Sequence, residues 1–261
     1  STGTVGAWTL LSRVLGLVRD VVFARVFGAS LVMDAFFVAF RIPNIFRRFF
    51  AEGSFSQAFV PVFAEYDQVG DRAEVVELVR RTAGTLGLIL SGLAAVGAIA
   101  APAFIMVFAP GFVTEGGEAE ASRYALAVDM LRWTFPYLVC VSLAALAGGI
   151  LNTYQRYVAA AFSPVLLNVV LIVFAVWIAP LYERPGMALA AGVFAAGVVQ
   201  LVCMLPSLAR LRLLPWPAWG WRHPGVRKIL RLMIPGLFGS SVAQISILLD
   251  TLIASFLVTG S

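Results

Sequence analysis

Long apolar runs separated by short polar connectors dominate the chain. A helix needs about 20 apolar residues to cross the roughly 30 Å hydrocarbon core of a bilayer, and the runs reach that length. They lack the alternating segments of about ten residues that mark transmembrane β-strands. The pattern therefore predicts an all-α polytopic membrane protein with about seven transmembrane helices, over residues 5–27, 31–66, 78–108, 124–151, 158–180, 186–208 and 226–258.

The second range is too long for a straight span at 1.5 Å per residue, so it must tilt, kink or run along the membrane surface. Pro43 and Gly53 are the predicted bends within it, and Gly16 and Pro235-Gly236 are candidate bending points in the first and seventh spans.

The connectors predict the orientation in the membrane. Those after spans two and six are rich in arginine and the one after span four holds Arg156, whereas the connector over residues 109–122 holds three glutamates and no lysine or arginine. Because cytoplasmic connectors carry an excess of Lys and Arg, we expect a multi-pass protein of the bacterial cytoplasmic (inner) membrane with a cytoplasmic N-terminus.

Composition agrees with the membrane assignment, since 61% of the residues are hydrophobic and 13% are charged, against about 25% charged in soluble domains. The net charge of +5 does not indicate nucleic-acid binding, because the cations lie at helix ends or inside apolar helices rather than on one basic face. The chain has no P-loop, dinucleotide fingerprint or Ser/His/Asp pattern. One histidine and two cysteines offer no metal site. We therefore expect neither an enzyme nor a cofactor.

Charged residues inside the apolar runs concentrate in the first two spans. Each costs about 2.5–3.5 kcal/mol on membrane-insertion scales, so such residues are interpreted as functional by default. Residues 13–52 include six arginines and three acids. The excess positive charge predicts a cavity with an anionic ligand, and a diphosphate suits the guanidinium fork. The candidate substrate-binding residues are Arg13, Arg19, Arg47, Ser12 and Arg48, and the supporting acids are Asp20, Asp34 and Glu52.

Helical spacing groups the residues of the first span. Ser12 and Arg19 are seven positions apart, as are Arg13 and Asp20, so the two pairs form neighbouring stripes on one broad polar face. The alternative is a structural set of ion pairs, such as one joining Arg19, Asp20 and Asp34, that locks two helices together.

Asp250 in the seventh span is the other candidate site. Few cationic residues lie near it in the sequence, so its carboxylate could bind Na⁺ or H⁺ as a coupling ion. The alternative is a polar residue whose hydrogen bonds are satisfied at a helix interface. Asn152, Asn168 and Gln200 fit helix–helix hydrogen bonding better than substrate binding.

Two motifs resemble the MurJ/MviN lipid II flippases of the MOP exporter superfamily. They are SRVLGLVRDVVFARVFG (residues 12–28) and DAFFVAFRIPNIFRRFFAEGSFSQAFVPVFAEY (residues 34–66), and the order of later stretches such as ILNTYQRY (150–157) also matches. The resemblance implies a MOP/MATE-like bundle of roughly fourteen helices in two lobes. It would place Arg13, Arg19 and Arg47 in the cavity with Asp20 and Asp34 nearby.

The implied function is alternating-access movement of lipid II, an undecaprenyl-diphosphate-linked peptidoglycan precursor, to the outer leaflet. On this interpretation residues 1–212 form the N-lobe, residues 213–261 form a cytoplasmic connector and span seven, and the C-terminal half of the same protein is a required partner. The alternatives are an exporter of another polyprenyl-diphosphate-linked oligosaccharide, a multidrug antiporter, and a non-transporting scaffold for cell-wall synthases. Six arginines argue against the antiporter, whose cavity would favour acids and aromatics.

Overall fold

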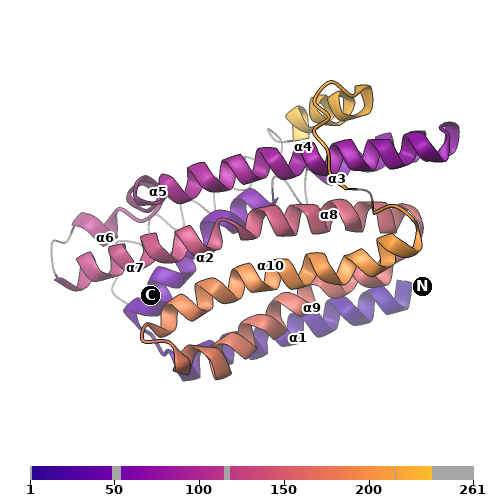
Figure 1. Ribbon diagram of the computed structural model, residues 1–261. Coiled ribbons are helices and arrows are strands. Elements are labelled where there is room, and N and C mark those ends of the chain that lie inside the picture. Colours follow the sequence, from indigo (N-terminus) through magenta and orange to yellow (C-terminus); the bar gives the residue numbers. More distant parts are fainter. Residues whose placement is uncertain (1, 49–53, 115–117, 215, 237–261) are drawn as a thin grey trace.

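The computed structural model describes residues 2–48, 54–114, 118–214 and 216–236, and this part of the chain is a helical bundle without strands. Figure 1 shows the long helices side by side, with α1 next to α9 and α4 on the opposite side of the bundle. The helices are α1 (Thr2–Val26), α2 (Leu31–Arg47), α3 (Ser54–Val69), α4 (Arg72–Ile99), α5 (Ala101–Phe108), α6 (Gly111–Thr114), α7 (Glu118–Thr134), α8 (Tyr137–Thr153), α9 (Tyr157–Val173) and α10 (Pro185–Arg210).

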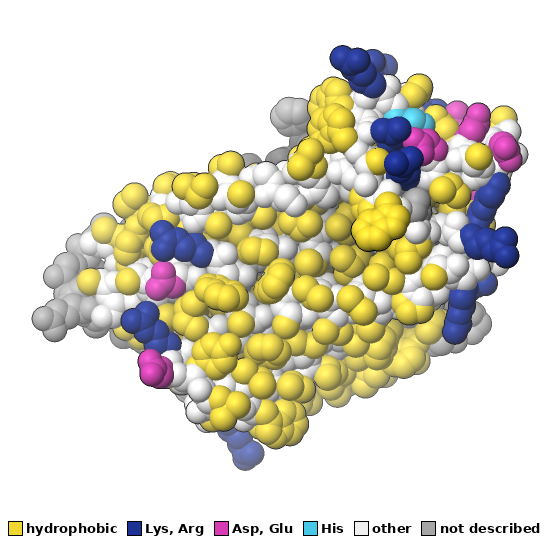
Figure 2. Space-filling model, in the orientation of Figure 1, with side chains coloured by type: hydrophobic (Ala, Val, Ile, Leu, Met, Phe, Trp, Pro, Cys, Tyr) yellow, Lys and Arg dark blue, Asp and Glu magenta, His cyan; other side chains and the backbone are white. Residues whose placement is uncertain are grey.

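Four helical stretches of the described chain are long and apolar enough to cross a membrane. They are Arg72–Ile99, Ala121–Thr153, which joins α7 and α8, Tyr157–Leu181 and Pro185–Arg210. These correspond to the predicted third to sixth spans. In Figure 2 hydrophobic side chains cover the middle of the visible face, and charged side chains gather towards its ends. This distribution is typical of a membrane-spanning bundle.

The other predicted spans differ from these four. The first is helical over 25 residues but carries four charged side chains. The second is divided into α2 and α3, and Gly53 between them lies outside the described residues. The third is divided at Ala100, where α4 ends and α5 begins before Pro102. Only residues 226–236 of the seventh span are described, and they are helical.

Pro43 lies inside α2, and the helix continues past it to Arg47. Proline has no N–H, so the carbonyl of Ala39, four residues earlier, loses its helical donor. The hydroxyl of Thr134 in α7 can replace that donor: its Oγ1 lies 3.0 Å from the Ala39 oxygen and 3.1 Å from the Leu131 oxygen, and its one hydrogen is shared between them. The helix is therefore stabilised at Pro43 from a neighbouring helix, because a buried carbonyl needs a partner, and the bend at Pro43 stays a prediction.

Replacing Thr134 with valine should lower the free energy of unfolding by about 1–2 kcal/mol, because it leaves the buried Ala39 carbonyl without this donor. Thr82 is the matched control: it is also buried, and its hydroxyl has no hydrogen-bond partner in the described part of the chain. Thr82→Val should be neutral or stabilising. Thermal unfolding of the two purified variants measures the difference, and equal shifts would contradict the assignment.

Aromatic side chains organise the packing of both halves of the bundle. In α3, Phe55, Phe59 and Phe63 recur every four residues on one helical face and stack with successive ring centroids 5.4 Å apart. They pack in a core with α4, α8 and α10. A second core surrounds α2 and α7, where the ring of Phe36 stacks on that of Phe40, with centroids 5.7 Å apart. These cores hold α2 and α8–α10 in place around the candidate site.

The connector after α10 crosses α4 at close range. The N–H of Ala218 donates to the Arg80 carbonyl at 3.1 Å, and a Cβ on Gly84 would come within 2.3 Å of the Ala218 backbone. Only glycine allows this approach. Burial lowers the pKa of His223 in the same connector below its ordinary value, so its imidazole is neutral near pH 7. The connector is thus packed against α4 of the bundle.

Candidate functional site

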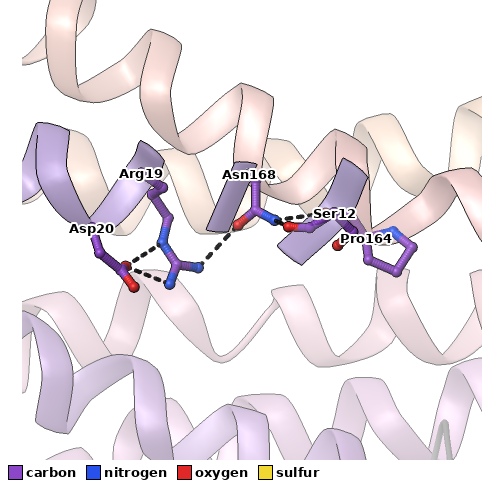
Figure 3. Close-up of polar contacts among 5 residues, drawn as sticks. All are labelled: Ser12, Arg19, Asp20, Pro164 and Asn168. Carbon is purple, nitrogen blue, oxygen red and sulfur yellow. Dashed lines mark hydrogen bonds and ion pairs between the residues drawn. The ribbon is translucent and has the colours of Figure 1, made fainter. Parts of the chain in front are cut away.

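Arg19 is held between two helices. Its Nε and Nη2 lie 2.9 and 2.6 Å from Asp20 Oδ1, and its Nη1 lies 3.1 Å from Asn168 Oδ1 on α9 (Figure 3). Asn168 in turn donates from Nδ2 to the carbonyls of Ser12, at 3.1 Å, and Pro164, at 3.2 Å. The guanidinium carries five N–H groups, of which these contacts use three. The remaining donors can serve an anion.

The two polar stripes predicted for the first span lie on the α-helix α1. The Arg19 guanidinium donates to Asn168 and the Ser12 backbone carbonyl accepts from it, so this part of α1 faces α9. Arg13 and Asp20 are exposed on the neighbouring stripe. The Arg19 guanidinium, paired with Asp20, is therefore held at the α1–α9 seam, and the exposed Arg13 lies on the neighbouring stripe.

Arg47 lies at the C-terminal end of α2 and donates from Nε to Asn44 Oδ1 at 2.7 Å. Its side chain lines a cleft of about 370 Å³ that is walled by α2, α3, α8, α9 and α10. Small residues on α8, including Gly148 and Gly149, open the space. Pro164 belongs to this cleft and also accepts the bond from Asn168. One segment of α9 therefore connects the Arg19 network to the cleft of Arg47.

Asp34 is not part of the Arg19 network. Its Oδ2 lies 3.9 Å from Arg123 Nη2 on α7, and the Arg123 side chain is only 8% exposed. The guanidinium also lies over the ring of Phe112, 5.1 Å from its centroid. Arg19 and Asp20 form the ion pair that the structural alternative proposed, whereas Asp34 joins α2 to α7. Arg19 and Asp20 therefore belong to the α1–α9 contact, and Asp34 belongs to the α2–α7 contact.

The structure describes only one of the three remaining candidate residues. Arg48 follows α2 and is half-buried. Glu52 and Asp250 lie outside the described residues. Among the described residues no group of three or more His, Cys, Asp or Glu side chains is arranged to hold a metal ion.

Sequence reasoning underestimated three polar residues. Asn168 does join two helices as expected, but it also orients the Arg19 guanidinium. Gln200 borders the cleft of Arg47. Arg123 has no distinctive sequence pattern around it, yet it is the buried cation opposite Asp34. For Asn168 and Gln200 the available signal was a lone polar residue in an otherwise apolar run, which marks a position but not its partner.

The fold and the site define a class of protein: a polytopic α-helical membrane protein with arginines set into its helix bundle. The model of the family described as "Lipid II flippase MurJ" matches residues 23–261. The "Probable lipid II flippase MurJ" of Vibrio cholerae is 48% identical over 259 residues, and the "Lipid II flippase MurJ" of Burkholderia cenocepacia is 45% identical over 262 residues. The chain belongs to the lipid II flippase MurJ family.

A solved structure agrees with this assignment. The chain superimposes on "Lipid II flippase MurJ, inward closed conformation" with a TM-score of 0.79 at 25% identity, covering 98% of this chain and 51% of that one. The predicted MOP-type helical bundle is thereby confirmed. The matches cover 98% and 99% of this chain but 49% and 50% of the Vibrio and Burkholderia proteins, respectively. The chain therefore spans about half the length of the curated relatives it matches.

Proposed function

We propose that this chain supplies the N-terminal lobe of a flippase that moves lipid II, a polyprenyl-diphosphate-linked precursor of peptidoglycan, from the cytoplasmic to the outer leaflet. The observation that carries the proposal is the Arg19 network. A guanidinium with spare donors is fixed on the α1–α9 seam beside exposed Arg13, and a diphosphate is the ligand that suits such forks.

In this mechanism Arg13, Arg19 and Arg47 bind the anionic headgroup, and the polyprenyl tail remains in lipid. Residues 1–212 move as one lobe against the C-terminal half of the full-length protein, which opens the cavity first to the cytoplasm and then outward. The arginine-rich connectors support a cytoplasmic N-terminus in this mechanism. Asp250 is the proposed site for Na⁺ or H⁺, if transport is ion-coupled. Binding and reorientation involve no covalent step.

The proposal is tested by reconstituting the full-length protein in liposomes with lipid II in the inner leaflet. We expect lipid II to become accessible to an external glycan-modifying probe faster than in protein-free liposomes. A neutral polyprenol-linked sugar of the same chain length is the control substrate and should not be accelerated, because it lacks the diphosphate that the arginines bind. Equal rates for the two substrates would reject a role for the diphosphate.

A further inference from the structure

The cleft beside Arg47 contains a buried polar group whose hydrogen bonding is incomplete. Gln200 on α10 is 3% exposed, and its Nε2 donates to the Ser163 carbonyl at 2.8 Å. Its Oε1 is buried and has no hydrogen-bond partner in the described part of the chain. The Ser163 carbonyl determines the orientation of this amide, because the flipped amide would place two acceptors against each other. The oxygen is therefore an acceptor without a donor.

The proline of α9 affects a second acceptor in the same cleft. Pro164 has no N–H, so the carbonyl of Ala160, one turn earlier, lacks its i+4 donor. Both residues line the cleft. Asn152 adds a side-chain amide on the α8 wall. The cleft thus offers acceptor groups next to a cationic residue.

The charges of the lining restrict the ligand. Arg47 is the charged residue among the described side chains that line the cleft, and no acid is among them. A cation would be repelled by Arg47 and would find no counter-ion among the described lining residues, whereas a neutral O–H or N–H donor can bind Gln200 Oε1. Ala144, Ala145 and Gly148 provide small apolar surfaces beside these acceptors. This mixture fits an uncharged sugar with hydroxyl and acylamino groups.

We propose that this cleft is a second subsite, which takes the sugar next to the diphosphate and for which Gln200 is a specificity-determining residue. The inference rests on the proposed function, since Arg47 would bind the diphosphate at the wall of the cleft. A volume of about 370 Å³ lies within the range of small-molecule sites, roughly 300–1,000 Å³. Leaving the buried acceptor without a partner is unfavourable, and the sugar donor removes that penalty only when it is bound.

The test compares two ligands on the full-length protein: lipid II, and undecaprenyl diphosphate, which has no sugar. Gln200→Leu should weaken binding of lipid II about tenfold, as expected for one lost hydrogen bond, and should leave binding of undecaprenyl diphosphate unchanged. Ala145→Leu fills the cleft without removing a hydrogen bond and should give the same selective loss. The matched control is Ala95→Leu on the exposed face of α4, which should change neither affinity.

The outcomes separate the subsite from the proposed function. Selective loss of lipid II binding in both cleft variants supports the subsite. Equal loss for both ligands would mean that Gln200 and Ala145 act on the bundle as a whole, and would overturn it. Unchanged affinities in Ala145→Leu would also overturn it, even if Gln200→Leu failed to fold. If the wild-type protein binds lipid II no more tightly than undecaprenyl diphosphate, the subsite alone is rejected. If the wild-type protein binds neither ligand, the proposed function is rejected.

Discussion

Replacing Arg19 with alanine in the full-length protein should abolish complementation of a strain depleted of its own flippase. The change removes the guanidinium that Asp20 and Asn168 hold at the α1–α9 seam. Hydrogen bonds to charged groups contribute roughly 1.5–3 kcal/mol each, so losing one or two bonds to the diphosphate should weaken binding about 10²-fold. Growth after depletion and titration with lipid II measure the two effects. Arg13→Ala should also abolish complementation and weaken lipid II binding, because Arg13 is the exposed cation on the adjoining stripe.

Two further substitutions make this result specific. Arg19→Lys keeps the charge but loses the planar fork, so it should restore binding only in part. Arg184→Ala is the control for losing an exposed arginine: that side chain is 74% exposed and lies 3.9 Å from Asp129. It should support normal growth. Normal growth of Arg19→Ala with normal membrane insertion would show that the α1–α9 network is structural, as the ion-pair alternative holds.

The sequence predicted the helices better than it predicted the partners of their polar residues. Apolar length and spacing are local properties, so the third to sixth spans and the two stripes of α1 could be read directly. The second span was harder, because α2 continues past Pro43, where the Thr134 hydroxyl of α7 lies within hydrogen-bond distance of the Ala39 carbonyl. That bond joins residues 95 positions apart, and nothing in the local pattern around Pro43 indicates it.

The candidate site shows the same limit. Arg19 and Asp20 are neighbours in sequence and could be paired by inspection. Asn168 is 149 residues from Arg19, and its contact depends on α9 packing along α1. The sequence therefore identified which charges are unusual in a membrane helix but could not assign Asp34 to Arg123 rather than to Arg19. Such assignments require the helix packing itself.

The pairing of Asp34 with Arg123 can be measured by a double-mutant cycle in the full-length protein. Removing one partner of a buried ion pair typically costs about 3–5 kcal/mol, whereas replacing both with apolar residues is often neutral. Asp34→Leu should therefore lower the free energy of unfolding by about 3 kcal/mol, because it leaves the nearly buried Arg123 cation without this carboxylate. The Asp34→Leu/Arg123→Leu double variant should be more stable than the sum of the single changes predicts.

The exposed Asp129–Arg132 pair, 3.4 Å apart, is the control, and Asp129→Leu should cost less than about 1 kcal/mol. If Asp34 instead holds a cavity arginine, as the sequence predicted, then Arg123→Leu will not relieve the loss caused by Asp34→Leu, and the two changes will add. Thermal unfolding with and without lipid II distinguishes these roles. A carboxylate that positions the cavity arginines changes the stabilisation by ligand, while one that joins α2 to α7 changes the stability of the unliganded protein and leaves the ligand-induced shift intact.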